Sequence, residues 1–475
     1  MNRQAGLLIP ISATPGKYGV GDFGQELYKL TKIANESGFK MLQVLPLNPV
    51  GYGNSPYQSY SSSAIDPIYV DIDDLVARGL LTDAPEAFEP QNKADYTAAR
   101  NLKNACLKKA FAKFSKDESF AAFLNDHQWV EDYAQFMVLK SRDESKIWYE
   151  WEDAAKEYDN LSYEFNQDDL DFYKFSQFIL FDQWFKYKQF ANDLGLKIIG
   201  DIPIYVSIDS HDVWAKRSNY LLDESGRPTH VAGVPPDYFS EDGQLWGNPL
   251  YDWEQLEANN FEFWIERFRH NRSMYDVIRV DHFRAFDTYW KIPAGDTTAR
   301  NGEWLEAPGH ALFNVIFNHF TTDEIVVEDL GDMRPEVYQL RDDFGLTGMK
   351  IIQFSLDPNE TNNNFEDYEN LIVYTGTHDN QTLKGWYEEL SAAEQSNLQS
   401  RFGANPLTGI IEDSFKSVAN LVVLPIQDVL LLDDTARFNV PGTIGEHNWT
   451  WKLTELNSFE QSVEHTKALI EKYNR

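Results

Sequence analysis

Four apolar segments of this sequence each end in a carboxylate side chain. Asp201 follows "KIIG", Asp281 follows "VIRV", Glu328 follows "EIVV", and His378 with Asp379 follows "VYTGT". A buried charge is costly unless it is paired or used in chemistry. Four acids at the same position, near the end of an apolar run, are poorly explained as four unrelated helix caps or ion pairs. We therefore treat these acids as one candidate site.

Three kinds of site could use such a set of acids. Carboxylates from neighbouring strands could bind a divalent metal such as Mg²⁺, two of them could act on opposite sides of a glycosidic bond, or all could form a structural ion-pair network. Arg279 lies two residues before Asp281, on the same face of an extended strand. A guanidinium there would repel a metal ion and lower the pKa of Asp281. This pattern favours glycoside chemistry.

Glycosyl transfer needs an anion that meets the developing positive charge and a protonated acid beside the departing oxygen. Asp281 suits the first role. Glu328 suits the second, because Val326 and Val327 give it an apolar setting that would raise its pKa. Strand alternation alone does not exclude the neighbouring Asp329, which would point to the other face.

Asp379 and His378 suit the recognition of a sugar. A carboxylate can accept hydrogen bonds from ring hydroxyls that tighten in the transition state, and an adjacent imidazole can donate one. We expect this pair to lie beside the other two acids.

The elements that would position these residues are short, nearly continuous apolar runs, most of them separated by helical sequence. Such runs are typical of strands buried on both faces of a parallel sheet. Eight of them predict an α/β fold of the (β/α)8 TIM-barrel type, in which strand ends converge on one mouth. The runs span residues 5–11, 41–47, 196–206, 276–283, 324–330, 349–357, 371–379 and 421–430.

Residues 24–38 and 174–195 have apolar residues at helical spacing and end on glycine, which is typical of helices. A bare barrel needs roughly 250 residues, so the rest must form insertions. We expect large insertions at the C-terminal face, at about 48–173, 207–261 and 284–311. The tail from residue 433 has room for a loop and a helix but for no C-terminal β-sandwich. We predict a single catalytic domain over 1–475.

The composition narrows the partners and the compartment. A net charge of −33 argues against nucleic acid or an anionic membrane as the main partner. The one cysteine, Cys106, cannot form an intramolecular disulfide, which fits a reducing compartment. The first apolar run is short and broken by Pro10, unlike a signal peptide or membrane span. We expect a cytoplasmic protein.

Taken together, the motifs resemble those of a known enzyme family. "IIGDIPIYV", "IRVDHFRAF", "VVEDLG" and "GTHDN" resemble the four strand-end motifs of the α-amylase clan. The segments "PYQSYSS", "GVPPDYFSEDGQLWGNPLYDW" and "NVPGT" resemble those of the 4-α-glucanotransferases, or amylomaltases. The likeness runs from about residue 6 to residue 449, and this family lacks the C-terminal sandwich of most α-amylases.

The resemblance implies roles for individual residues. Asp281 would be the nucleophile that forms a covalent glycosyl intermediate, Glu328 the general acid and base, and Asp379 the third carboxylate, which helps to distort the sugar. The residues implied to bind substrate are Tyr57, Asp201, Asp237, Phe239, Gln244, Trp246, Asn248, Arg279 and His378. "VPPDYFS" would be a mobile loop over the acceptor sites. No cofactor and no metal is implied.

We therefore expect a retaining 4-α-glucanotransferase that moves α-1,4-glucan segments from a maltodextrin donor to a glucose or maltodextrin acceptor, as a monomer or homodimer. The alternatives are an α-1,4-glucan hydrolase of the same clan, a metal-dependent TIM-barrel enzyme and a non-enzymatic glucan-binding protein. A binding protein has no need of a nucleophile beside an acid of raised pKa.

Overall fold

The computed structural model describes residues 3–51, 53–236, 240–360 and 367–475. Its largest sheet has eight parallel strands in the order β10-β11-β12-β1-β2-β3-β6-β9. The ends of this order meet, because Val327 N donates to Thr347 O at 2.9 Å and Val326 bridges Thr347 in parallel. The predicted (β/α)8 barrel is thereby confirmed. Its strands are β1 (Gln4–Leu8), β2 (Met41–Gln43), β3 (Lys197–Ile202), β6 (Val277–Val280), β9 (Ile325–Val327), β10 (Gly348–Ile351), β11 (Leu371–Tyr374) and β12 (Leu421–Pro425).

Each of the eight apolar runs overlaps one of these strands, but the strands end earlier than the runs do. The run at 349–357 leaves β10 and enters the short helix α13 (Ile352–Ser355), and the run at 421–430 enters α17 (Ile426–Val429). Buried helices need the same apolar residues as buried strands, so composition does not mark the change. Residues just past the strand ends therefore lie on loops and short helical turns at the mouth.

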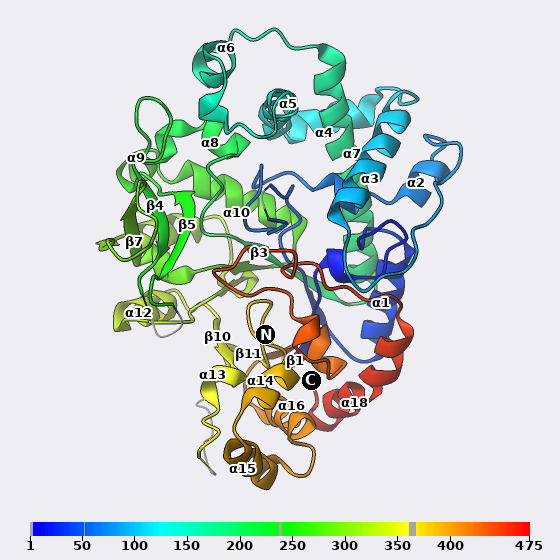
Figure 1. Cartoon of the computed structure of the whole chain (residues 1–475), viewed down its shortest axis with the longest axis vertical. Helices are drawn as coiled ribbons and strands as arrows, with labels where there is room; N and C mark the ends of the chain where they lie inside the picture. The colour runs from blue at the N-terminus through cyan, green and yellow to red at the C-terminus, as the bar shows by residue number, and fades with distance from the viewer. Residues whose placement is uncertain (1–2, 52, 237–239, 361–366) are drawn as a thin grey trace.

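Helices surround the barrel and build most of the additional mass (Figure 1). Both helices expected from their glycine ends are present as α1 and α7, and Gly38 and Gly195 follow them with φ of 93° and 82°, which glycine adopts without strain. The helices α2 to α6 lie between β2 and β3. The helices outside the barrel strands are α1 (Gln25–Glu36), α2 (Ile72–Ala77), α3 (Tyr96–Phe111), α4 (Glu118–Asp126), α5 (Trp129–Lys140), α6 (Asp153–Lys156), α7 (Gln167–Asp193), α8 (His211–Ala215), α9 (Trp253–Ala258), α10 (Glu262–Met274), α11 (Gly309–Ile316), α12 (Pro335–Asp343), α14 (Leu383–Glu389), α15 (Ala392–Phe402), α16 (Pro406–Lys416) and α18 (Asn457–Tyr473).

A second, antiparallel sheet was not expected from the sequence. Its strands, in the order β5-β4-β7-β8, are β4 (His230–Val234), β5 (Gln244–Pro249), β7 (Thr288–Pro293) and β8 (Glu303–Glu306). Two segments separated by β6 thus form one sheet, which stands beside the barrel mouth (Figure 1). The pairing of β4 with β7 links them, and such long-range pairing leaves no local signal in the sequence.

The hydrophobic core follows the barrel and its flanking helices. Val422 and Val423 of β12 and Ile372 and Val373 of β11 are fully buried, as strands covered on both faces should be. Within the described part of the chain, no helix combines the length and apolarity needed to cross a bilayer.

Candidate active site

A buried arginine joins two of the predicted acids. Asp201 on β3 and Arg279 on β6 are register partners in adjacent parallel strands. Arg279 Nη1 lies 2.8 and 2.7 Å from the two carboxylate oxygens of Asp201 and 2.9 Å from Asp281 Oδ1. Only 3% of Arg279 is exposed. A single guanidinium nitrogen thus lies between two carboxylates, where it compensates the negative charge of both.

The pKa of Asp281 differs from the expectation. Burial raises it to about 6, and the charge of Asp201 adds to this rise, although Arg279 acts in the opposite direction. The Asp281 side chain keeps 23% of its surface exposed, so it faces the mouth while protein surrounds it on its other sides. The predicted direction was wrong because desolvation outweighs the neighbouring cation. A pKa of about 6 still leaves most of the carboxyl ionised at neutral pH.

Glu328 follows β9, the neighbour of β6 in the barrel. Its Oε2 accepts a hydrogen bond of 2.6 Å from the backbone N–H of His282. Burial and the nearby charge of Asp281 raise the pKa of Glu328 to about 8. The expected direction is confirmed, but Asp281 contributes as well as the apolar setting. Glu328 can therefore hold a proton near neutral pH, and Oε1 is the oxygen without the backbone donor.

Asp329 takes no part in this group of acids. Its carboxylate pairs with Arg341 at 2.6 Å and accepts from Met349 N at 2.7 Å. The alternation of the chain thus turns Asp329 toward the outer layer and Glu328 toward the mouth. Of these two neighbouring acids, Glu328 is therefore the one that lies close enough to Asp281 to feel its charge.

Tyr57 connects the Asp201 side of the site to the loop after β11. Its hydroxyl donates to Asp201 Oδ2 at 2.7 Å and lies 2.9 Å from His378 Nε2. The two rings stack with centroids 5.3 Å apart. His378 Nε2 also lies 3.2 Å from Asp379 Oδ2. One chain of polar contacts therefore runs from Asp281 through Arg279 and Asp201 to Asp379.

Asp379 is held as an ionised carboxylate. Burial alone would raise its pKa, but the His378 ring and a hydrogen bond from Asn439 lower it to about 2. Asn439 Nδ2 donates to Asp379 Oδ1 at 2.7 Å, and Arg437 Nη2 donates to the Asp379 carbonyl at 2.8 Å. Asn439 and Arg437 were absent from the predicted site. Asn439 lies in the quoted "NVPGT" motif, but no spacing rule connects it to Asp379.

His282 is a further residue that was absent from the predicted site. Its backbone is left-handed, with φ of 47°, a conformation that costs a non-glycine residue free energy and that clusters at functional sites. This turn directs the His282 N–H at Glu328. The imidazole packs edge-on against Trp246, with centroids 4.9 Å apart.

The strand β5 forms a wall next to these residues. Trp246 Nε1 donates to Gln244 Oε1 at 3.1 Å, and Asn248 Nδ2 donates to Val206 O at 2.9 Å. Gln58, the neighbour of Tyr57, donates to Asn248 Oδ1 at 3.1 Å. The structure therefore brings ten of the predicted residues to the barrel mouth, and the other two, Asp237 and Phe239, lie outside the described residues.

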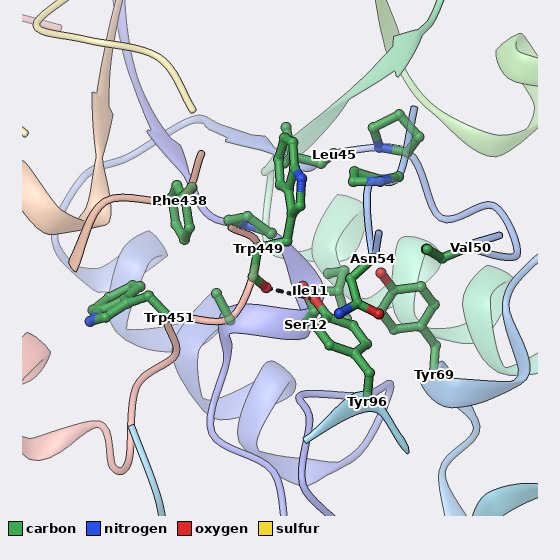
Figure 2. Close-up of a pocket in the computed structure, with 14 residues that line it drawn as sticks. Ile11, Ser12, Leu45, Val50, Asn54, Tyr69, Tyr96, Phe438, Trp449 and Trp451 are labelled. Carbon is green, nitrogen blue, oxygen red and sulfur yellow. Dashed lines mark hydrogen bonds between the residues drawn. The ribbon is translucent and has the colours of Figure 1, made fainter. Parts of the chain in front are cut away.

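Figure 2 shows a pocket lined in part by the aromatic side chains of Tyr96 and Trp449. Trp449 packs against both Tyr57 and His378, with centroids 5.9 Å apart in each case. Its carbonyl accepts a 2.8 Å hydrogen bond from the Tyr96 hydroxyl. Pro56, which precedes Tyr57, also lines the pocket. This packing fixes the segment that carries Tyr57 against the C-terminal part of the chain.

A bound metal ion would need several ligating side chains around one point. No group of three or more His, Cys, Asp or Glu side chains in the described ranges is arranged to hold one. Between Asp201 and Asp281 the positive charge is that of Arg279.

Comparison with known proteins supplies the family. The model of the 4-alpha-glucanotransferase family matches residues 9–457. A 4-alpha-glucanotransferase of Thermus thermophilus is 42% identical over 95% of this chain and 95% of its own length, and that of Clostridium butyricum is 40% identical over 94% and 95%. A solved amylomaltase from Streptococcus agalactiae, in complex with acarbose, superposes with a TM-score of 0.94 at 33% identity over the whole of both chains. The chain therefore belongs to the 4-alpha-glucanotransferase family.

Proposed function

We propose that this 4-α-glucanotransferase transfers α-1,4-glucan segments by a retaining mechanism through a covalent glycosyl-aspartate intermediate. Asp281 attacks the anomeric carbon of the donor while Glu328 protonates the departing 4-oxygen, so one carbon–oxygen bond forms as another breaks. Glu328 then removes the proton from the 4-hydroxyl of an acceptor glucan. That oxygen attacks the anomeric carbon and releases Asp281, so the configuration is retained.

The observation that carries this proposal is the different surroundings of two neighbouring, partly buried carboxyls, Asp281 and Glu328. Asp281 forms an ion pair with Arg279 at 2.9 Å, whereas the Glu328 carboxyl accepts a hydrogen bond from the uncharged backbone N–H of His282 at 2.6 Å. The pKa of Asp281 is raised to about 6 and that of Glu328 to about 8. Two carboxyls whose pKa values are pushed apart suit a nucleophile and an acid. Near pH 7, Asp281 is mostly ionised and Glu328 mostly protonated.

The remaining residues would recognise the sugar at the point of cleavage. Asp379 is ionised and its side chain is 44% exposed, so it can accept hydrogen bonds from ring hydroxyls. Tyr57, His378, Asp201 and Arg279 would surround the same sugar. Trp246, with Gln244 and Asn248, would line the cleft next to them, and Asp237 and Phe239 would approach the incoming acceptor.

Transfer instead of hydrolysis requires that water stay away while the intermediate waits for an acceptor. The aromatic surroundings, including Trp246, Trp449 and Tyr57, favour such a site. The runner-up function is hydrolysis of α-1,4-glucans, in which water takes the place of the acceptor. It would use the same three carboxylates.

The first test is the product profile from maltotriose as sole substrate, with EDTA present. Transfer predicts glucose and longer maltodextrins at a constant number of reducing ends. An increase in reducing ends with only shorter sugars would show hydrolysis, and activity that is lost with EDTA and restored by Mg²⁺ would show a metal-dependent enzyme. Binding of maltodextrin without any change in its length distribution would show a binding protein.

Two variants test the assigned roles. Glu328→Gln, supplied with an α-glucosyl fluoride whose leaving group needs no acid, should accumulate a glycosyl adduct on Asp281 that mass spectrometry can locate. Asp281→Asn should be inactive and form no adduct. Asp329→Asn is the matched control, because this adjacent carboxylate faces Arg341 instead of the mouth. Near-normal activity of Asp281→Asn would refute the assignment.

We also propose that the protein works in the cytoplasm as a monomer or homodimer. Light scattering coupled to size-exclusion chromatography measures the oligomeric state directly, and a larger assembly would contradict this part.

A further inference from the structure

The loop at residues 375–382 presents His378 and Asp379, and one buried carboxylate holds both of its ends. Asp428 Oδ2 accepts from the Thr375 hydroxyl, at the end of β11. Asp428 Oδ1 accepts from Leu383 N at 2.8 Å, at the start of α14. Asp428 is 1% exposed and Thr375 is fully buried. Because Asp428 follows β12, the barrel neighbour of β11, it acts on the loop from the adjacent strand.

Further hydrogen bonds stiffen the loop between these two ends. Asn380 Oδ1 accepts from both the N–H and the hydroxyl of Thr377, each at 2.9 Å. Asp434 accepts from Thr382 N at 2.8 Å and from Gln381 Nε2 at 2.9 Å. The backbone that carries His378 and Asp379 is thereby fixed on both sides of these two residues.

Asp428 holds this position without a cationic partner. Within the described residues no Lys, Arg or His lies at ion-pair distance from it, and its two described donors are both uncharged. Burial raises the pKa of Asp428 to about 6, against the effect of those two hydrogen bonds. A buried acid of this kind costs stability unless each oxygen has a partner. The two contacts to the loop supply those partners.

We propose that Asp428 is a positioning residue, which sets His378 and Asp379 against the sugar at the cleavage point by fixing both ends of their loop. This inference rests on the proposed function of that site. If the loop shifts, His378 loses its place beside Tyr57, and Asp379 loses the hydrogen bond from Asn439. Displacements of about 1 Å can cost roughly 100-fold in rate.

The experiment is a double-mutant cycle between Asp428 and Asp379, measured as kcat and KM for maltotriose disproportionation. We expect Asp428→Ala to lower kcat by roughly 10- to 100-fold with little change in KM. In an Asp379→Asn background the further loss should largely disappear, because Asp428 acts through the loop. Asp428→Asn should keep most of the activity, since its amide can accept from Leu383 N and donate to the Thr375 hydroxyl. Thr375→Val removes the hydrogen bond from the Thr375 hydroxyl to Asp428 without a change of side-chain size. It replaces Asp428→Ala in the cycle if that variant does not fold.

Asp276→Ala is the matched control. This carboxylate also accepts from a backbone N–H, that of Ile198, at 2.8 Å, and from Asn192 at 2.8 Å, but it lies at the opposite end of β6 from the mouth. Any effect of this variant on kcat should multiply with that of Asp379→Asn. If the fold-loss in kcat from Asp428→Ala or Thr375→Val also multiplies with the fold-loss from Asp379→Asn in the double variant, the positioning role is refuted. If Asp379→Asn alone keeps full activity, the proposed function of the site is wrong instead.

Discussion

Replacing Arg279 by glutamine should show how far this one cation sets the charge of the nucleophile. All the Arg279 hydrogen bonds to the acids come from Nη1, which lies 2.9 Å from Asp281 and 2.8 and 2.7 Å from the two oxygens of Asp201. Arg279→Gln keeps a polar side chain of similar reach and removes the charge. We therefore expect its main effect to be electrostatic.

The size of the effect follows from the pKa of Asp281, which is about 6 with Arg279 in place. A neighbouring opposite charge lowers a carboxyl pKa by about one to three. Without that charge, Asp281 should titrate at roughly 7 to 9, and at pH 7 the ionised fraction should fall by about 2- to 100-fold. kcat/KM at pH 7 should fall by at least the same factor, because only the ionised carboxylate attacks.

The assay is kcat/KM for maltotriose from about pH 5 to about pH 9. In Arg279→Gln the acidic limb of the bell-shaped pH profile should move to higher pH, toward the alkaline limb that deprotonation of Glu328 sets. The profile should therefore become both narrower and lower. Arg279→Lys is the control, because a lysine Nζ can take the place of Nη1 and keep the charge. It should lose part of the activity with little movement of the acidic limb.

Stability provides a second measure of the same charge. Losing one partner from a buried ion pair typically costs about 3–5 kcal/mol. The pKa of Asp281 in the folded protein is already raised above its pKa in the unfolded chain. The contribution of Asp281 to stability is therefore fully present at a pH below the unfolded-state pKa, and it is lost as the pH rises through the folded-state pKa. Arg279→Gln raises the folded pKa further. Its deficit in urea unfolding should therefore grow from about pH 4 to about pH 8.

A folded Arg279→Gln variant whose acidic limb coincides with that of the parent enzyme would refute this reasoning. A loss of kcat/KM by the same factor at every pH would also count against it, because that pattern belongs to a lost substrate contact and not to a changed nucleophile.

Three other substitutions test separate parts of the structure. Tyr57→Phe should lower kcat/KM by roughly 10- to 100-fold, because it removes a hydrogen bond to the charged Asp201 that is worth about 1.5–3 kcal/mol. The phenylalanine ring keeps the stacking contact with His378. A change below twofold would contradict this prediction. Gly200→Ala should reduce the free energy of unfolding by about 1–3 kcal/mol or more, since its Cβ would lie 2.1 Å from the Tyr275 ring. Gly295→Ala, with no atom within 4 Å of its Cβ, is the control in the same urea titration. His282→Gly should be more stable than His282→Ala by about 1 kcal/mol, because only glycine adopts the φ of 47° at this position without strain. Both variants lack the imidazole ring, so its loss does not affect the comparison. The opposite order of stability in thermal unfolding would show that the turn is not strained.

The barrel could be predicted from the sequence because each strand carries its own signal. Residues 421–425 read "LVVLP" and 371–374 read "LIVY", and these runs are apolar at every position because both faces are covered. The antiparallel sheet could not be predicted in the same way. Trp290 pairs with Gly233, which lies on the other side of β6 in sequence, and such a pairing depends on how the barrel brings two loops together.

The candidate acids were found because chemistry concentrates at strand ends, but the residues that hold them were found only in part. Asn439 and Asp428 reach the loop of Asp379 from the segment after β12, and that approach depends on the closure of the barrel. His282 acts through its backbone N–H, so its side-chain type gave no sign of the role.

The pKa of Asp281 shows why residue types alone give the wrong balance of forces. Arg279 two positions away on one strand indicates a lowered pKa, and the contact at 2.9 Å is indeed present. Asp201 shares the same guanidinium nitrogen, however, so part of the positive charge is already compensated, while burial penalises the ionised form of Asp281. Only the folded arrangement shows that one cation serves two acids. Burial raises the pKa of Glu328, and Asp281 raises it further, because a nucleophile that stays charged is a negative neighbour for the acid. The two roles are therefore coupled, and a substitution that neutralises Asp281 should also lower the pKa of Glu328.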